Sequence, residues 1–298
     1  MKKRFLLCVG CQKGGTTWLA EYLAATPGVR LGFQKEMHVL DTHFFAPHWL
    51  ETRSRNLRAA LTQLSPDPSE KRDRLTRQLA ATELSQNLVG DLDAYARYFR
   101  GLAEGAEVVA DLTPNYALLT TAHWTETRDA LERHGFQPRI VFLMRDPERR
   151  MESAWRMHER NAPDRKRPPK GGLRGLLQRF AVSQKAKAPY LAFAGGENLE
   201  RSRYETTIRA LETVFRPEDI HYEFYESLFR PEAVAAINAF LGLPDRPANF
   251  DIRVNTSPVR TVIAPGERAR VRALLAPTYR FCAERFGEAR IRDLWQTI

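Results

Sequence analysis

Cysteine is scarce in this chain of 298 residues, which argues against a disulfide-rich protein and against a zinc protein with cysteine ligands. Three cysteines occur, and two of them, Cys8 and Cys11, lie close together near the N-terminus. A small odd number of cysteines offers no disulfide framework and is typical of a reducing compartment. No second pair of Cys or His residues completes the four ligands of a tetrahedral zinc site. We therefore expect neither a disulfide scaffold nor a bound metal.

Long apolar runs are also missing. No stretch of about 18 apolar residues occurs, so we expect no membrane-spanning helix. The basic start Met1–Arg4 and the apolar run Phe5–Gly10 imitate a signal peptide, but the run is short and leads into Gln-Lys-Gly-Gly instead of a small-residue cleavage site. A first buried strand explains the run better, and we expect a cytoplasmic protein.

Acidic residues are in the minority. The chain has 46 Lys and Arg against 36 Asp and Glu, a formal net charge of +10. Such an excess attracts anionic ligands such as nucleotides, polysaccharides, nucleic acids or membrane surfaces, without choosing among them. Hydrophobic residues make up 43% of the chain, which is typical of a globular protein and argues against disorder. Without internal repeats or a clear linker, residues 1–298 are expected to form a single domain.

Strand and helix patterns alternate along the chain. Buried strands are predicted from short apolar runs at 3–10, 29–33, 108–111, 139–144 and 220–225. Helices are predicted from the spacing of apolar residues over 16–25, 121–133, 199–215, 231–241 and 265–286, and from a charged helical pattern between 47 and 91 with a turn at 66–68. The alternation indicates βαβ units, so we predict an α/β fold with a central parallel sheet of four or five strands flanked by helices.

A glycine-rich loop stands between the first predicted strand and the helix after it, with the sequence Lys13-Gly14-Gly15-Thr16-Thr17. The glycines let backbone N–H groups turn inward, and the helix adds the positive end of its dipole. The lysine and the two hydroxyls supply further donors to an anion. The loop resembles a Walker A loop but lacks its Gly-Lys-Ser/Thr end, which argues against a site for Mg²⁺ and a nucleoside triphosphate. A plain strand–turn–helix connection is the alternative interpretation of this loop alone.

A second group of polar residues follows the second predicted strand. Glu36 and His38 are two residues apart and would point the same way from an extended segment. A glutamate can take a proton from an acceptor hydroxyl, and a histidine can orient or tune it. Asp41 could in turn fix the tautomer of the imidazole. An ordinary polar loop gives the same pattern, so the group has little weight in isolation.

A third pair spans the end of the strand 139–144 and the helix after it. Parallel sheets bind ligands at the carboxyl ends of their strands, where Arg145 stands. Ser153, eight residues later, lies on the adjoining helix, so the two side chains could hold one phosphate from two sides. A surface ion pair of Arg145 with Asp146 or Glu148 is the alternative.

Together these motifs resemble the PAPS-dependent sulfotransferases, from about residue 5 to residue 286. The resemblance implies transfer of a sulfuryl group from 3′-phosphoadenosine 5′-phosphosulfate (PAPS) to a hydroxyl or amine, without a metal. The segment from Lys13 to Thr17 looks like the family's 5′-phosphosulfate loop, and Arg145 with Ser153 looks like its 3′-phosphate-binding pair. The implied PAPS-binding residues include Gly14, Gly15 and Thr16.

Further segments resemble one branch of that family, which sulfates heparan sulfate and other glycans. Its acidic cluster, with a glutamate base, is similar to Glu36-x-His38-x-x-Asp41, and its substrate-cleft segment is similar to Asp111–Tyr116, with Leu112 where Lys or Ser is usual. Ser202-Arg203-Tyr204 resembles a segment near the nucleotide, which implies contact by Tyr204. Arg260 lies where relatives often carry a nucleotide loop.

The expected acceptor is a small molecule or glycan, polar and anionic, and no nucleic acid partner is expected. A basic loop within 161–172 would attract an anionic acceptor, although such a run is usually only solvated; its basic residues are Arg165, Lys166, Arg167 and Lys170. Two other functions stay open. One is a P-loop phosphotransferase that uses ATP, and the other is a non-catalytic basic protein that binds polyanions.

Overall fold

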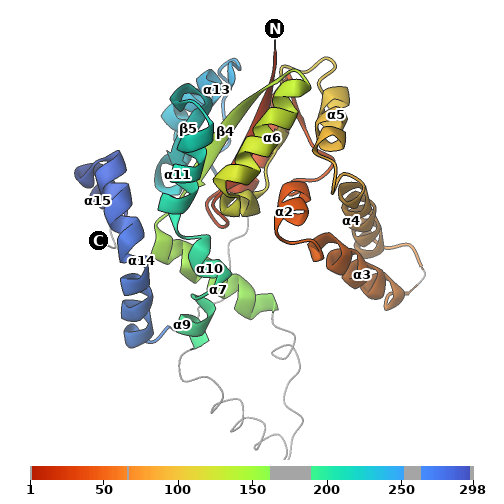
Figure 1. The fold of residues 1–298 in the computed structure, drawn as a ribbon. Helices are drawn as coiled ribbons and strands as arrows, with labels where there is room; N and C mark the ends of the chain where they lie inside the picture. The colour runs from red at the N-terminus through yellow and green to blue at the C-terminus, as the bar shows by residue number, and fades with distance from the viewer. Residues whose placement is uncertain (1, 66, 162–188, 252–262, 296–298) are drawn as a thin grey trace, which may run out of the picture. The chain divides into compact units, whose positions relative to one another are not determined.

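The computed structural model describes residues 2–65, 67–161, 189–251 and 263–295 (Figure 1). The chain divides into two compact units, the first of residues 1–144 and 206–252 and the second of residues 145–205 and 253–298. That residues 1–298 act as one domain stays a prediction. Within the described ranges, no helix is both long and apolar enough to cross a membrane.

The first unit is built on a five-stranded sheet with the order β2-β3-β1-β4-β5, in which every pairing is parallel. Its strands are β1 (Lys3–Gly10), β2 (Val29–Leu31), β3 (Val108–Asp111), β4 (Phe136–Met144) and β5 (Ile220–Phe224). The prediction of an α/β fold with a central parallel sheet is confirmed. Because all five strands run in the same direction, their carboxyl ends lie at one edge of the sheet.

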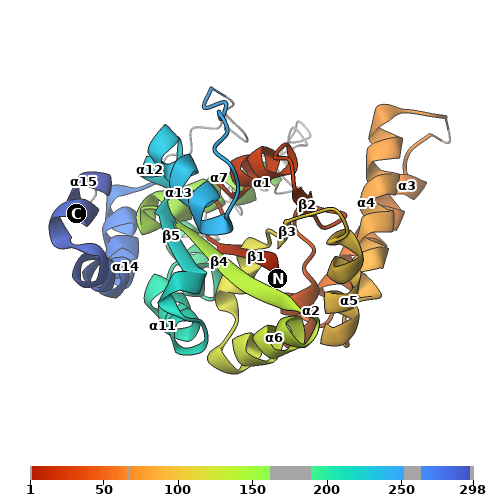
Figure 2. The ribbon, with the colours of Figure 1, turned by 90° about the horizontal axis from the view of Figure 1, so that it is seen from above.

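Helices cover both faces of this sheet, which explains why the strands are continuous apolar runs. Figure 2 shows α1, α12 and α13 on one face and α6 and α11 on the other. The residues of β1 from Phe5 to Val9 have no exposed surface. A strand buried on both faces needs apolar side chains in both directions, as is typical of a parallel sheet. Aromatic rings fill one side of the core, where Phe5 contacts Tyr95, Phe99 and Phe136.

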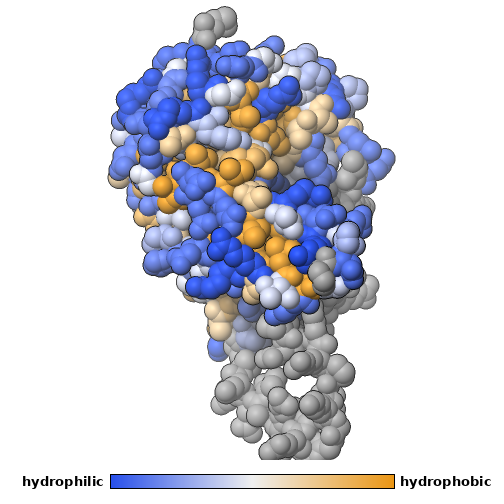
Figure 3. Space-filling view, turned by 90° about the vertical axis from the view of Figure 1, so that its right-hand side faces the viewer, coloured by the Kyte–Doolittle hydropathy of each residue, from blue (hydrophilic) through white to orange (hydrophobic). Residues whose placement is uncertain are grey.

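In the first unit, the helices predicted at 16–25, 121–133 and 231–241 agree with the structure to within one residue. The helices of this unit are α1 (Thr16–Ala24), α2 (Val39–Phe44), α3 (Trp49–Thr62), α4 (Glu70–Gln86), α5 (Leu92–Leu102), α6 (Thr121–Arg133), α11 (Tyr204–Val214), α12 (Tyr225–Leu228) and α13 (Pro231–Leu241), with the 3-10 helices η1 (Pro114–Leu118) and η3 (Pro217–Asp219). The side that carries α3, α4 and α5 presents patches of hydrophobic side chains bordered by hydrophilic ones (Figure 3).

The second unit is helical in the part that the structure describes. It contains α7 (Pro147–Asn161), α9 (Pro189–Phe193), α10 (Glu197–Glu200), α14 (Pro265–Phe286) and α15 (Glu288–Leu294). Glu148 at the start of α7 is fully buried and forms ion pairs with Arg268 and Arg272 of α14. Because a buried carboxylate needs such partners, these pairs tie the two helices together.

The prediction of one continuous helix over 199–215 is wrong. The chain instead forms α10, a turn and then α11, which starts at Tyr204. The break lies beside the fully buried Arg150, whose Nε donates to Ser202 Oγ over 2.9 Å and whose Nη2 donates to the Asn198 carbonyl over 2.8 Å. The buried guanidinium therefore takes carbonyl and hydroxyl acceptors from the chain at this turn.

Gly15→Ala is expected to lower the free energy of unfolding by about 2–4 kcal/mol. Gly15 has φ +95°, a left-handed conformation, and an added Cβ would lie 2.7 Å from Leu228 Cδ2, so conformational and packing costs add. The matched control is Gly90→Ala, where φ is +92° but no described atom lies within 4 Å. This control should cost only about 1–2 kcal/mol. Equal losses in urea denaturation would contradict the packing argument.

Candidate active site

The loop between β1 and α1 contains two residues with left-handed backbone conformation. Lys13 and Gly15 both have positive φ, 73° and 95°, and the N–H of Gly14 donates to the carbonyl of Cys11 over 2.9 Å. A Cβ on Gly14 would lie 2.6 Å from Cys11 Sγ, so only glycine fits. Among the described residues, no side chain caps the start of α1, and its first turn holds no acidic residue. The N–H groups of this helix end can therefore point at a negative ligand.

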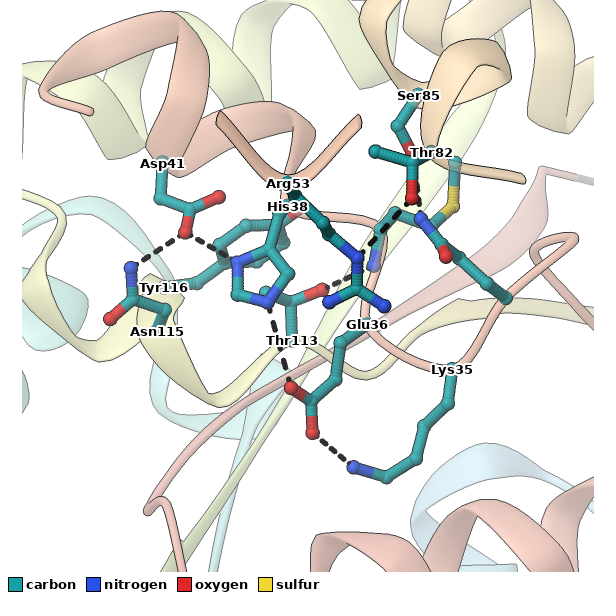
Figure 4. Close-up of polar contacts among 12 residues, drawn as sticks. Lys35, Glu36, His38, Asp41, Arg53, Thr82, Ser85, Thr113, Asn115 and Tyr116 are labelled. Carbon is teal, nitrogen blue, oxygen red and sulfur yellow. Dashed lines mark hydrogen bonds and ion pairs between the residues drawn. The ribbon is translucent and has the colours of Figure 1, made fainter. Parts of the chain in front are cut away.

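The structure brings Glu36, His38 and Asp41 together after β2 (Figure 4). The imidazole of His38 lies between the two carboxylates, with Nδ1 2.7 Å from Asp41 Oδ2 and Nε2 3.5 Å from Glu36 Oε2. The segment is not extended at this point, because His38 has φ 55° and ψ 30°. This left-handed turn directs the imidazole back toward Glu36 and forward toward Asp41 at once.

Charges around Glu36 favour its ionised form. Burial by itself would raise the pKa of Glu36, but the hydrogen bond from His38 and the ion pair with Lys35 outweigh it and lower the pKa to about 2. For His38, burial favours the neutral imidazole, while the hydrogen bonds to Asp41 and Glu36 raise the pKa above its ordinary value. At neutral pH the site therefore holds a carboxylate flanked by positive charge.

A buried carboxylate at the end of β3, Asp111, is linked to this cluster through hydrogen-bonded hydroxyl groups. Asp111 is 1% exposed and accepts three hydrogen bonds from hydroxyl groups. Tyr95 Oη donates over 2.9 Å, Thr113 Oγ1 over 2.7 Å and Tyr116 Oη over 2.8 Å. Despite these donors, burial dominates and raises the pKa of Asp111 to about 6.

The same hydroxyls hold the backbone that carries His38. Thr113 Oγ1 accepts from the N–H of Met37 over 3.0 Å, and Tyr116 Oη accepts from the N–H groups of Val39 and Leu40 over 3.2 and 3.3 Å.

Asn115 extends this support to a side chain of the cluster. Its Nδ2 donates to Asp41 Oδ2 over 2.6 Å. The segment 111–116, which resembles a substrate-cleft segment, is buried here and fixes the loop 37–41.

The remaining predicted nucleotide-binding residues lie in the second unit. Arg145 precedes α7 and Ser153 lies on α7, half-buried. Tyr204 is fully buried, and its Oη donates to the carbonyl of Arg145 over 2.7 Å, so these two predicted residues are in contact. Arg260 and the basic residues Arg165, Lys166, Arg167 and Lys170 lie outside the described residues.

Two charged residues of the site were not predicted from the sequence. Lys35 is adjacent to Glu36 in the chain, a signal that could have been used. Arg53 lies on α3, interacts with Glu36 through its charge and gives no local signal. Within the described ranges, no cluster of three or more His, Cys, Asp or Glu could hold a metal ion.

Wild type and Asp111→Asn are expected to differ in stability, and this difference should become smaller as the pH rises. The fold retains the Asp111 proton up to about pH 6, whereas an unfolded chain releases it near pH 3.8, so this group stabilises the fold most below pH 4 and less as the pH passes 6. Melting temperatures of both proteins from pH 4 to pH 7 check this. A constant or widening gap for Asp111→Asn would contradict the assignment.

The chain is similar to known proteins both in sequence and in fold. The model of a family described as "Sulfotransferase family" matches residues 6–246. A solved sulfotransferase from Alicyclobacillus acidocaldarius is 20% identical, with a TM-score of 0.53 over 99% of this chain and 97% of that chain. At this identity the likeness concerns the fold. Comparison with curated protein sequences gives no match.

Two further solved structures resemble the chain more distantly. The sulfotransferase domain from the curacin biosynthetic pathway is 17% identical, with a TM-score of 0.49 over 83% of this chain and 76% of that chain. The sulfotransferase domain from the Synechococcus PCC 7002 olefin synthase is 20% identical, with a TM-score of 0.44 over 92% and 89% of the two chains.

Proposed function

Because this chain belongs to the sulfotransferase family, we propose that it transfers a sulfuryl group from PAPS to a hydroxyl group of a polar, carbohydrate-like acceptor. The observation that carries the proposal is the geometry of Glu36, His38 and Asp41, which follow β2 at the same carboxyl edge of the sheet as the loop that follows β1. In the reaction, a bond forms between the acceptor oxygen and sulfur, and the bond between sulfur and the bridging phosphate oxygen breaks. The acceptor proton goes to Glu36, and 3′,5′-ADP is released.

The anion loop fits the phosphosulfate end of such a donor. Lys13, the N–H groups at the start of α1 and the hydroxyls of Thr16 and Thr17 would hold this end and stabilise charge on the departing phosphate. The left-handed backbone of Lys13 and Gly15 supports this assignment, because such turns direct neighbouring N–H groups into a concave anion site. Arg145, Ser153 and Tyr204 would select the donor through its 3′-phosphate, as the family resemblance implies.

Glu36 is proposed as the base although its pKa is about 2. A carboxylate of such low pKa is a poor base toward a free alcohol. As the oxygen–sulfur bond forms, however, the acceptor oxygen becomes strongly acidic, and a weak base suffices if it stands within hydrogen-bond reach. His38 orients Glu36, and Asp41 holds the imidazole through Nδ1.

Donor binding has a direct test in thermal shift. We expect 3′,5′-ADP to raise the melting temperature and ATP with Mg²⁺ to leave it unchanged. A ligand at 100 times its Kd stabilises by about 2.7 kcal/mol, which is readily measured. Lys13→Ala should weaken the shift, while the exposed Lys71→Ala on α4 should preserve it. Stabilisation by ATP with Mg²⁺ alone would favour a phosphotransferase, and stabilisation by neither nucleotide would favour a non-catalytic polyanion-binding protein.

Glu36→Gln is expected to reduce kcat by about 10²–10⁴, since the amide keeps the shape of the side chain but cannot accept the proton. Affinity for 3′,5′-ADP should stay within a few-fold of wild type. The control is Glu51→Gln, an exposed glutamate on α3, which should leave both quantities unchanged. Turnover with labelled PAPS and calorimetry with 3′,5′-ADP measure the two effects. A variant that loses nucleotide binding but keeps its kcat would remove Glu36 from the role of base.

A further inference from the structure

A groove of about 780 Å³ opens between α3 and α4. Its lining combines an aromatic ring, a guanidinium and amide groups, supplied by Trp49, Arg53, Asn56 and Gln78. Amides and a guanidinium are the groups that proteins use to bind hydroxyls and carboxylates. Most of the groove surface is apolar, and these few polar groups can fix the orientation of a ligand.

Contacts connect this groove with the proposed reaction centre. The ring of Trp49 stacks on the imidazole of His38, with 3.7 Å between the ring centroids and 30° between the planes. The guanidinium of Arg53 lies over the same Trp49 ring, 5.3 Å from its centroid. The charge of Glu36 also acts on the guanidinium of Arg53, and Figure 4 shows both side chains together with His38. A ligand in the groove therefore lies within one side chain of the proposed base.

A buried hydroxyl fixes the position of Arg53. Its Nε donates to Thr82 Oγ1 over 3.2 Å, and Thr82, which is fully buried, donates in turn to the carbonyl of Gln78 over 2.7 Å. In the part of the chain that the structure describes, neither terminal nitrogen of Arg53 has a hydrogen-bond partner. These terminal N–H groups can therefore pair with a ligand, and the planar fork of the guanidinium matches a carboxylate.

The carboxylate of Glu36 does not pair with the terminal N–H groups of Arg53. The charge of Glu36 partly offsets the effect of burial on the pKa of Arg53, so the two groups are within electrostatic reach. The carboxylate of Glu36 is nevertheless bonded to Lys35 and His38, not to Arg53. The fork of Arg53 thus remains open toward the groove.

We propose that this groove is the acceptor subsite and that Arg53 binds a carboxylate of an acidic saccharide, whose hydroxyl is thereby brought to Glu36. Asn56 and Gln78 would bond further hydroxyls of the same sugar. The inference rests on the proposed function, which it deepens by naming the acceptor class and a residue that determines specificity. Positive charge at Arg53 also explains how an anionic acceptor is tolerated beside the carboxylate of Glu36.

The test compares two ligands that differ only in whether their uronic acids carry carboxylates or the reduced hydroxymethyl groups. An unsulfated chondroitin tetrasaccharide and its carboxyl-reduced counterpart are titrated into the full chain, saturated with 3′,5′-ADP, by calorimetry. Wild type is expected to bind the acidic form about ten- to a hundredfold more tightly, the range for one charge-assisted hydrogen-bond pair. Arg53→Gln should lose this preference and leave the affinity for the reduced form unchanged. Arg55→Gln, on an exposed position of the same helix outside the groove, should keep it.

Three further variants separate binding from folding. Arg53→Lys keeps the charge without the fork and should retain part of the preference. Thr82→Val should reduce the preference by freeing Arg53, and Thr82→Ser should restore it. The inference is overturned if Arg53→Gln keeps the preference, if Arg55→Gln loses it equally, or if wild type binds both forms alike or neither. Failure of 3′,5′-ADP to bind wild type would instead defeat the proposed function, so the two failures are distinguishable.

Discussion

The site depends on one buried carboxylate. Asp111 ends β3 inside the fold, where an ionisable group without partners would be costly. Three hydroxyls satisfy it, and two of these, from Thr113 and Tyr116, use their remaining capacity to accept N–H groups of the segment 37–40. The sheet thereby fixes a loop that has little regular structure of its own. The strained turn at His38 persists because this network holds the backbone on both sides of it.

The charged groups around Glu36 and those near the start of α1 have different electrostatic effects. Glu36 stands among Lys35, His38 and Arg53, so its carboxylate stays ionised and its basicity is low. A site of this kind favours a reaction in which the proton leaves late, after the new bond has made it acidic. The loop before α1 has the opposite electrostatic character. It lies at the positive end of the α1 helix dipole, and the first turn of α1 holds no acidic residue.

Much of the fold could be predicted from local pattern, because strands buried on both faces are apolar throughout and amphipathic helices repeat every three to four residues. The strand 108–111 and the helices 121–133, 231–241 and 265–286 agree with the structure to the residue. The turn before Tyr204 could not be predicted, since it depends on the buried Arg150, about fifty residues away. Arg53 and the supporting role of Asp111 were missed for the same reason. Their partners are set by tertiary packing, which spacing along the chain does not encode.

The α3–α4 pair lies in the chain between β2 and β3 and contributes no strand to the sheet. Its links to the reaction centre pass through few side chains, chiefly Trp49 and Arg53. Side chains of α3 and α4 can therefore be substituted without changing a strand of the sheet. With the proposed acceptor subsite on these two helices, substitutions on their inner surface would change the acceptor while the loop after β1 and the hydrogen bonds of Asp111 stay intact.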